Sequence, residues 1–426
     1  GLSPEPGRMS PADAHRRRFI LLSSLRWVGT GCVIPTLVVL MQSRGLTLAQ
    51  IGVAAAAQGV LVLLLELPTG GLADTLGPRR VLLASGAIES LALILFIGAE
   101  SFPLFAVAWG VMGVSRALDS GPLEAWYVDR ALRLDDAADI ERGIAHGGAA
   151  LSIAISGGAL LAAFLVTIGP IAGIDALVLP VIAGLCFSVA NVVAVSRLVT
   201  DDPDRHSGRA VEAVRETPTA VRDGLGLVRG SPGLRALVLI ELLWGAGLVG
   251  VEFLSGPRLV EVLGNPEQGV AVLGVTAAVA WSISGLGAAG TGTLVRWCGT
   301  PARAGVVTRI VQAAAVALMA VVAGPVGLIT GYLGFYLVHG AANAVHYGMV
   351  HRLVDEGRRT TILSVSSLVA RVGGTAADVG LGVVAAGPGI GTAFALSAIL
   401  LLAGAPLYPV AGRELAARTS DVTAEP

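Results

Sequence analysis

Charged side chains recur inside long apolar stretches of this chain, where they are energetically costly and therefore candidates for function. Arg116 lies about 17 Å from one end of its apolar run, close to the middle, and Asp119 follows one helical turn later. Arg26 and Glu66 occupy similar depths in two earlier runs and could pair. A carboxylate beside an arginine can have its proton occupancy controlled by a ligand or a conformational change. These four residues, with Glu124 nearer the surface, form a predicted proton relay; the alternative is a set of salt bridges that only holds helices together.

A second group of polar residues is expected to face a small-molecule ligand. His339, Asn343 and His346 share one helical face at i, i+4 and i+7, which suits a polar ligand or a group that titrates near neutral pH. A metal site is not predicted, because about 10 Å separates the two histidines along the helix axis. Hydrogen bonds that pack helices are an equally good interpretation. Further candidates for the same ligand are Trp27, Tyr336, Glu241, Arg371 and Asp378.

Sequence motifs for soluble enzyme chemistry are missing from the chain. The phosphate-binding loop Gly-x-x-x-x-Gly-Lys-[Ser/Thr] does not occur, which argues against an ATP-driven pump, and neither His-Glu-x-x-His nor Cys-x-x-Cys is found. We therefore predict no catalytic residue, no metal and no bound cofactor.

The composition places these polar groups in a membrane. Of the 426 residues 54% are hydrophobic and only 14% charged, where a soluble chain carries about a quarter charged residues. A soluble core cannot absorb this much apolar surface. The net charge of −1 creates no overall field that would attract nucleic acid. All 29 basic residues are arginine, which with abundant alanine, glycine and valine indicates a GC-rich bacterial gene.

The apolar runs fall into two groups of six, and each has about the 20 residues that cross a bilayer as a helix. They lie at 19–41, 51–72, 81–99, 104–127, 144–168, 176–196, 236–254, 270–295, 305–322, 328–350, 360–385 and 391–410. We predict an all-α membrane protein with twelve transmembrane helices. Its expected parts are an N-tail (1–18), a six-helix bundle (19–196), a linker (197–235), a second six-helix bundle (236–410) and a C-tail (411–426). Within the linker, a short amphipathic helix is expected to begin at Thr217-Pro218 and to align Val221, Leu225 and Val228.

The distribution of arginine predicts the orientation in the membrane. With the N-terminus inside, 24 arginines fall in inner segments, counting Arg309 at the start of the ninth run, while the outer loops hold only Arg44 and Arg258. Both termini are therefore expected in the cytoplasm and the protein in the cell membrane. Met9 fits a natural start, which would make the eight residues before it a leader or a remnant.

The two groups of six runs carry matching loops. Gly70–Arg80 follows the second run and Gly292–Arg303 the eighth, and both read Gly-x-Leu, then glycine and proline, then arginine. A second pair, Trp126–Arg130 and Gly348–Arg352, has the same six-run offset. The halves therefore look like diverged copies, as in many transporters, where the substrate site lies at the interface of the repeats.

The first of these loops resembles a family signature. Gly70-Gly71-Leu72-Ala73-Asp74-Thr75-Leu76-Gly77-Pro78-Arg79-Arg80 is similar to the loop 2–3 motif of the major facilitator superfamily, Gly-x-Leu-Ala-Asp-x-x-Gly-x-[Arg/Lys]-[Arg/Lys]. The resemblance implies two pseudo-symmetric six-helix bundles that work by alternating access. It also implies a cytoplasmic gate motif made of Gly70, Asp74, Gly77, Arg79 and Arg80. A simple inside turn would explain the two arginines but not the other three residues. Arg116 stands where the family has an arginine linked to proton coupling, whereas the span-five antiporter signature is replaced around Ser156-Gly157-Gly158.

Together these features predict a secondary active transporter. We expect it to be proton-driven and monomeric, and to export an amphipathic small molecule such as a drug or secondary metabolite. Its expected partners are this substrate, protons and the lipid bilayer, without nucleic acid. The alternative is a proton symporter or uniporter that imports a polar nutrient, and a more distant one is a membrane receptor or an intramembrane enzyme.

Overall fold

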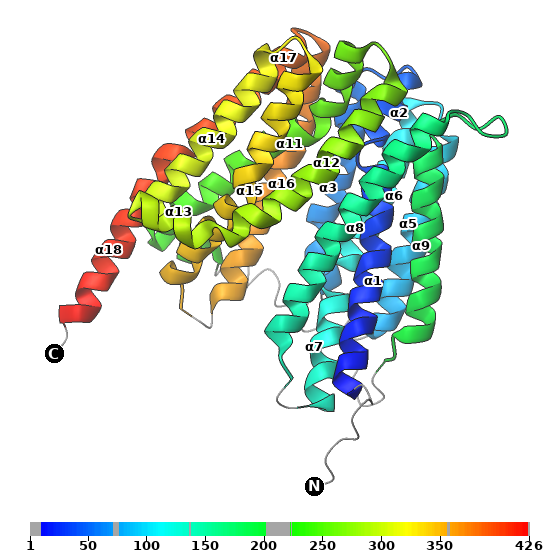
Figure 1. Cartoon of the computed structure of the whole chain (residues 1–426). Helices are drawn as coiled ribbons and strands as arrows, with labels where there is room; N and C mark the ends of the chain where they lie inside the picture. Colours follow the sequence, from blue (N-terminus) through cyan, green and yellow to red (C-terminus); the bar gives the residue numbers. More distant parts are fainter. Residues whose placement is uncertain are drawn as a thin grey trace.

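The computed structural model describes residues 10–70, 76–135, 138–201, 222, 224–355 and 358–424. Across these ranges the chain is almost entirely helical, and an isolated β-bridge joins Ile171 to Ile174. The helices form two bundles that follow each other in the sequence (Figure 1).

The N-terminal half extends from α1 to α9. Its helices are α1 (Pro11–Val33), α2 (Leu37–Ser43), α3 (Leu48–Gly70), α5 (Pro78–Gly98), α6 (Phe102–Asp119), α7 (Pro122–Leu134), α8 (Ile140–Ile168) and α9 (Leu179–Leu198). The C-terminal half contains α11 (Pro232–Leu263), α12 (Pro266–Ala289), α13 (Thr291–Cys298), α14 (Pro301–Val321), α15 (Pro325–Leu353), α16 (Arg359–Ala386), α17 (Ile390–Ala403), η2 (Ala405–Leu407) and α18 (Tyr408–Ala424).

Ten helical segments of the described chain are long and apolar enough to cross a membrane. Twelve crossings are reached with α6 and α15, which carry Arg116 and Asp119 and the histidines His339 and His346, respectively. These polar side chains lower the hydropathy of the two helices that hold them. The predicted twelve-helix fold is confirmed, and α6 and α15 carry several of the candidate site residues.

Prolines divide several of the expected runs. The run at 104–127 is broken after Asp119, because Gly121 adopts a left-handed φ of +96° and Pro122 begins a new helix, α7. The first run is similarly interrupted between α1 and α2, around Pro35. Asp119 is therefore the last residue of α6 and does not lie inside a continuous helix as expected.

The segment after 410, expected as a tail, continues as helix α18. The Glu414 carboxylate accepts hydrogen bonds from the Ser231 hydroxyl at 2.7 Å and the Gly233 amide at 2.6 Å. The Arg418 guanidinium donates to the Leu353 carbonyl at 2.9 Å. Helix α18 is thus fastened to the start of α11 and the end of α15.

The linker helix is described only in part. Residues 222 and 224–230 are helical, and Leu227 and Val228 pack against the apolar core of the C-terminal half. Thr217, Pro218 and Val221 lie outside the described residues.

Two arginines at matching positions show the relation between the halves. Arg44, after α2, donates to the carbonyls of Phe96 and Ile97 near the end of α5, at 3.0 and 2.9 Å. Arg258, near the end of α11, donates to the Val322 carbonyl at the end of α14, at 2.9 Å. In both halves an arginine at the end of the first span therefore satisfies carbonyls at the end of the third, as expected for diverged copies.

The halves meet along two helix pairs, with α3 packed on α16 and α8 packed on α12. They lie close together at the end of the molecule where α2 is found, and diverge toward the end where α1 begins and α18 ends (Figure 1). We call the first the sealed end and the second the termini end. Gly52 allows close contact of α3 and α16, since a Cβ there would collide with the Asp378 carbonyl oxygen.

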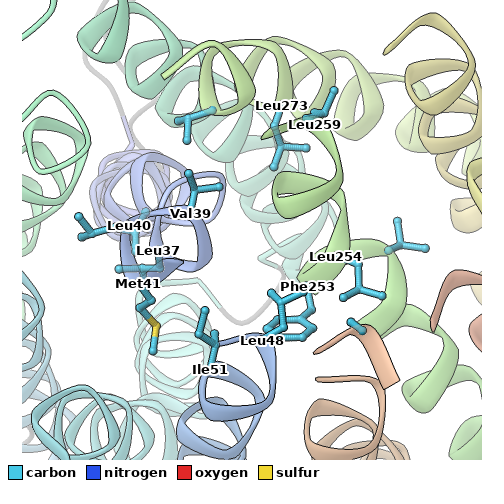
Figure 2. Close-up of a cluster of buried hydrophobic side chains, with 14 of the residues drawn as sticks. Leu37, Val39, Leu40, Met41, Leu48, Ile51, Phe253, Leu254, Leu259 and Leu273 are labelled. Carbon is cyan, nitrogen blue, oxygen red and sulfur yellow. The ribbon is translucent and has the colours of Figure 1, made fainter. Parts of the chain in front are cut away.

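An apolar cluster closes the sealed end. Figure 2 shows its side chains on α2, α3, α11 and α12, and the labelled ones are all buried. Its labelled members are Leu37, Val39, Leu40, Met41, Leu48, Ile51, Phe253, Leu254, Leu259 and Leu273. A pathway between the halves is therefore blocked at this end.

Candidate functional site

The predicted relay residues Arg26 and Asp119 form an ion pair. Arg26 comes from α1 and Asp119 from the last turn of α6, and the two side chains are 20% and 11% exposed. Desolvation of this degree strengthens the attraction between the charges while leaving both groups within reach of water. The pairing differs from the expected one, which joined Arg26 to Glu66.

Glu66 instead reaches across to the other half. Its Oε2 lies 3.6 Å from Nε of Arg371 on α16, and its Oε1 accepts a hydrogen bond from the Ser120 hydroxyl at 3.3 Å. The ion pair joins α3 to α16, the helices through which the halves touch. Arg371, expected as a substrate residue, thus contacts a member of the predicted relay.

Arg116 is linked to this network by the ring of Trp27 and by electrostatic interactions with two acids. The Trp27 ring is 4.8 Å from the guanidinium carbon of Arg26 and 6.0 Å from that of Arg116. Arg116 also interacts electrostatically with Asp119 and with Glu89. Both cations are attracted to the electrons of this ring in addition to the acids around them.

We call Arg26, Glu66, Arg116, Asp119 and Arg371 the interface cluster. Glu89 borders it on α5 and accepts a hydrogen bond from the Ser188 hydroxyl of α9 at 3.3 Å, as expected for a structural partner. Glu124 does not join the cluster: it is exposed in the first turn of α7, where a negative charge stabilises the helix N-terminus.

The C-terminal half presents an aromatic group with one acid. The Tyr336 hydroxyl donates to Oε1 of Glu252 at 3.4 Å, and its ring lies 5.0 Å from Tyr332 and 6.0 Å from Trp281. Glu252 interacts electrostatically with Arg116 of the other half. Asp378 is a further charge that interacts with Glu252. The sequence singled out Tyr336 and Asp378 but not Glu252, whose signal was a carboxylate near the end of an apolar run.

His339 and Asn343 lie next to this aromatic group. Nδ2 of Asn343 is 3.2 Å from Nε2 of His339, and the imidazole ring is 5.4 Å from the Tyr336 ring and 5.7 Å from the Trp244 ring. Both side chains are half-buried. Together with Trp244, Trp281 and Tyr336, these two residues form a polar and aromatic wall on α11, α12 and α15.

His346 does not share this wall, contrary to the expectation from its spacing. Its Nε2 lies 3.1 Å from Oε1 of Glu241, and the two side chains are 0% and 2% exposed. The Tyr408 hydroxyl is 3.5 Å from Nδ1 of the same ring. His346 and Glu241 therefore belong to the interior of the C-terminal half.

Arg309 completes this second group, although the sequence placed it near a loop. It is fully buried in α14 and donates to Oε1 of Gln312 at 2.8 Å. It interacts electrostatically with Glu241. We call Glu241, Arg309, Gln312, His346 and Tyr408 the sealed cluster, because they are enclosed within the C-terminal half. They are not part of the apolar cluster at the sealed end. Arg309 escaped notice because a run boundary cannot be drawn to within a few residues from hydropathy alone.

The predicted gate motif is described only in part, since Asp74 lies outside the described residues and Gly70 ends α3. Gly77 has a left-handed φ of +84° before Pro78, the first residue of α5. The Arg79 amide donates to Oδ1 of Asp201 at 3.0 Å and its guanidinium to the Ser196 carbonyl at 2.8 Å. Arg80 is exposed. The motif thus attaches the start of α5 to the end of α9.

The matching loop of the C-terminal half repeats this backbone feature. Gly299 has a φ of +79°, and Pro301 two residues later starts α14. Both loops thus place a left-handed glycine just before a helix that begins with proline. No group of three or more potential metal ligands occurs in the part of the chain that the structure describes.

Residues 19–377 match the family model of the Major Facilitator Superfamily. No curated protein sequence matches the chain. Among solved structures, the nucleoside transporter NupG is similar with a TM-score of 0.76 at 14% identity, covering 93% of this chain and 98% of that one.

Two other transporters have the same fold. A bacterial homolog of the human lysosomal transporter Spinster, in an inward-facing and occupied conformation, gives a TM-score of 0.69 at 16% identity, covering 95% of this chain and 98% of the other. The human organic anion transporter MFSD10 (TETRAN) gives 0.63 at 16% identity, covering 94% and 100%.

Proposed function

This chain belongs to the Major Facilitator Superfamily, and the solved structures similar to it are membrane transporters. We propose that it is a proton-driven secondary transporter. It exports an amphipathic small molecule by alternating access between its two halves. The observation that carries the coupling is the Arg26–Asp119 ion pair at the end of α6, beside the helices where the halves meet.

Proton coupling follows from competition for Asp119. While Arg26 pairs with this carboxylate, the ionised form is favoured. A movement of α1 relative to α6, or a substrate that engages Arg26 or Arg116, removes that stabilisation and lets Asp119 take up a proton. The free energy of the proton gradient is then linked to the conformational change. Glu66 is the second candidate, since it forms an ion pair with Arg371 of the other half.

An amphipathic substrate fits the chemistry of the two sides. The C-terminal half offers Trp281 and His339, which pack against the buried Tyr336, for stacking, with Glu252 as an acid. The N-terminal half offers Trp27 between two guanidinium groups. A planar or apolar body with a polar group can be held by both. By their names, the similar structures carry nucleosides or organic anions, which are small organic molecules.

The gate motif would close the termini end in the opposite state. Gly70, Asp74, Gly77, Arg79 and Arg80 lie at or around the connection between α3 and α5, and Arg79 already holds that connection against α9. The arginine count favours a cytoplasmic termini end in the cell membrane. We propose a monomer without bound cofactor. Import of a polar nutrient is the second candidate, supported by the hydrogen-bonding pair His339 and Asn343.

The test separates coupling from substrate movement. The protein is reconstituted in vesicles, where uptake driven by an imposed pH gradient is measured beside exchange of labelled for unlabelled substrate. Asp119→Asn should abolish gradient-driven transport and largely retain exchange, because exchange needs no net proton movement. Candidate substrates are first found by a thermal-shift screen.

Gradient-driven transport that survives in both Asp119→Asn and Glu66→Gln would disprove the coupling assignment. The direction is read from the orientation in which the gradient drives accumulation. Substrate that accumulates on the side that protons leave has moved against the proton flow, which indicates export. Substrate that accumulates on the side that protons reach has moved with them, which indicates the symporter.

A further inference from the structure

A cavity lies at the termini end of the C-terminal half, away from the interface cluster. It has a volume of about 1190 Å³ and lies among the start of α14, the end of α15, the start of α16 and the helix α18. Figure 1 shows α18 projecting from the side of this half that faces away from the N-terminal half. The cavity is therefore separate from the interface cluster and its use does not depend on the proposed function.

Arginines dominate the charge of this cavity, which we call the basic pocket. Five arginines and one carboxylate, that of Asp355, line it, and one of the arginines, Arg418, also pairs with Glu414 at 3.0 Å. The arginines are Arg303, Arg352, Arg359, Arg413 and Arg418. Guanidinium groups match phosphate oxygens with two parallel hydrogen bonds, and several converging on one space favour a phosphate over a carboxylate.

The remaining walls are apolar. Val306 of α14, Val354 after α15 and Leu415 of α18 line the same space, with Pro409. A free phosphate would gain nothing from these side chains, whereas the glycerol and first acyl carbons of a lipid would cover them. The pocket is thus basic on one part of its surface and apolar on another.

The position of the basic pocket along the membrane normal suits a lipid headgroup. Three apolar segments long enough to cross a membrane, Pro301–Val321, Thr361–Ala386 and Ile390–Arg418, begin or end at the pocket. Charged residues at such ends lie at the level of the headgroups. Basic pockets between transmembrane helices at this level are places where anionic headgroups bind.

The corresponding place in the N-terminal half is different. There the cavity formed by Pro78, Trp126 and Arg130 has a volume of only about 20 Å³ and includes the acids Asp129 and Asp201. Arg130 and Arg352 are matching residues of the internal repeat. The repeat therefore offers a control position with an arginine in a much smaller cavity that also holds two acids.

We propose that the basic pocket binds the phosphate headgroup of an anionic phospholipid, with its glycerol and acyl start against the apolar wall. The bound lipid links α14, α15, α16 and α18 and stabilises the C-terminal half at the termini end. Lipid that binds the folded protein raises its unfolding temperature in a concentration-dependent manner.

The experiment titrates the purified full chain in detergent with phosphatidylglycerol, with phosphatidylcholine and with inorganic phosphate, reading the thermal unfolding temperature and, by native mass spectrometry, the bound lipid. Phosphatidylglycerol should raise the unfolding temperature and the other two should not. Arg352→Gln/Arg413→Gln should weaken phosphatidylglycerol binding by at least about tenfold, since two charge-assisted contacts are lost. Arg130→Gln should leave it unchanged.

Three results would overturn the proposal. An equal shift with inorganic phosphate would assign the pocket to a free phosphate. Unchanged phosphatidylglycerol binding in the double variant, or an equal loss in Arg130→Gln, would show a general charge effect without a site. Should the double variant not fold, Arg413→Gln alone, exposed on α18, is expected to weaken binding roughly threefold and is judged by the same criteria.

Discussion

The interface cluster and the sealed cluster contain similar chemical groups in opposite surroundings. Each combines at least one arginine with a carboxylate from another helix. In the first, the paired side chains are 11% to 38% exposed and belong to both halves. In the second, the Glu241 and His346 side chains are at most 2% exposed and all members come from one half. A charge between two moving parts can exchange partners, whereas a charge sealed in one part can only stabilise or destabilise that part.

The largest effect on stability is expected from the sealed cluster. Glu241→Ala removes the direct partner of His346 and the carboxylate with which the buried Arg309 interacts, and a buried charge left without compensation costs about 3–5 kcal/mol. The expected result is a large drop in the unfolding temperature, measured on purified protein, with the ratio of gradient-driven transport to exchange unchanged in the molecules that fold.

The control for this variant removes both charges. Glu241→Leu/Arg309→Met replaces the pair by apolar side chains and should recover most of the lost stability. A selective loss of gradient-driven transport in that stable double variant would contradict the comparison, because it would give the sealed cluster a part in coupling.

The next effect concerns the packing that holds the halves together. Gly52→Leu inserts a side chain where α3 touches the Asp378 backbone, and overpacking of this kind costs about 1–3 kcal/mol. We expect a lower unfolding temperature and slower transport, because α3 and α16 can no longer approach near the sealed end.

Gly157→Leu is the matched control. Gly157 lies in α8 with open space around its Cβ position, so the same substitution should change neither quantity. Equal losses of unfolding temperature and transport rate in the two variants would indicate a general effect of leucine in these helices. The close contact at Gly52 would then not explain its effect.

The sequence predicted the fold, the five residues of the interface cluster and two of the sealed cluster, Glu241 and His346, but not their partners. Apolar runs and the Gly70–Arg80 loop are local features, and they identified the twelve helices and the family resemblance. The partner of Asp119 depends on the break at Gly121 and on the rotation of α1 about its axis, which involve residues far apart in the sequence. His346 shows the same limit, since its spacing from His339 does not reveal that Glu241 and Tyr408 enclose it.

A smaller effect is expected at the ion pair between the halves. Glu66 and Arg371 are partly exposed, so the pair contributes about 0.2–1 kcal/mol. Glu66→Arg and Arg371→Glu should each slow substrate exchange roughly two- to fivefold, the rate equivalent of such an energy. The exchanged pair Glu66→Arg/Arg371→Glu should recover at least half of the rate, since attraction across α3 and α16 is restored. Failure of the exchanged pair, with normal folding, would mean that each residue acts through other groups.

The smallest effect is expected at Glu124, and its substitution tests whether the interface cluster ends before α7. Its carboxylate is exposed in the first turn of α7, where the favourable interaction with the helix N-terminus is worth about 0.3 kcal/mol. Glu124→Gln should therefore leave gradient-driven transport and exchange within about twofold of wild type, measured in the same vesicles as Asp119→Asn. The two acids are five residues apart in sequence, but the turn at Gly121 separates the helices that carry them. If Glu124→Gln instead lost gradient-driven transport and retained exchange, protons would have to pass through the first turn of α7 to reach Asp119, and the interface cluster would extend toward the termini end.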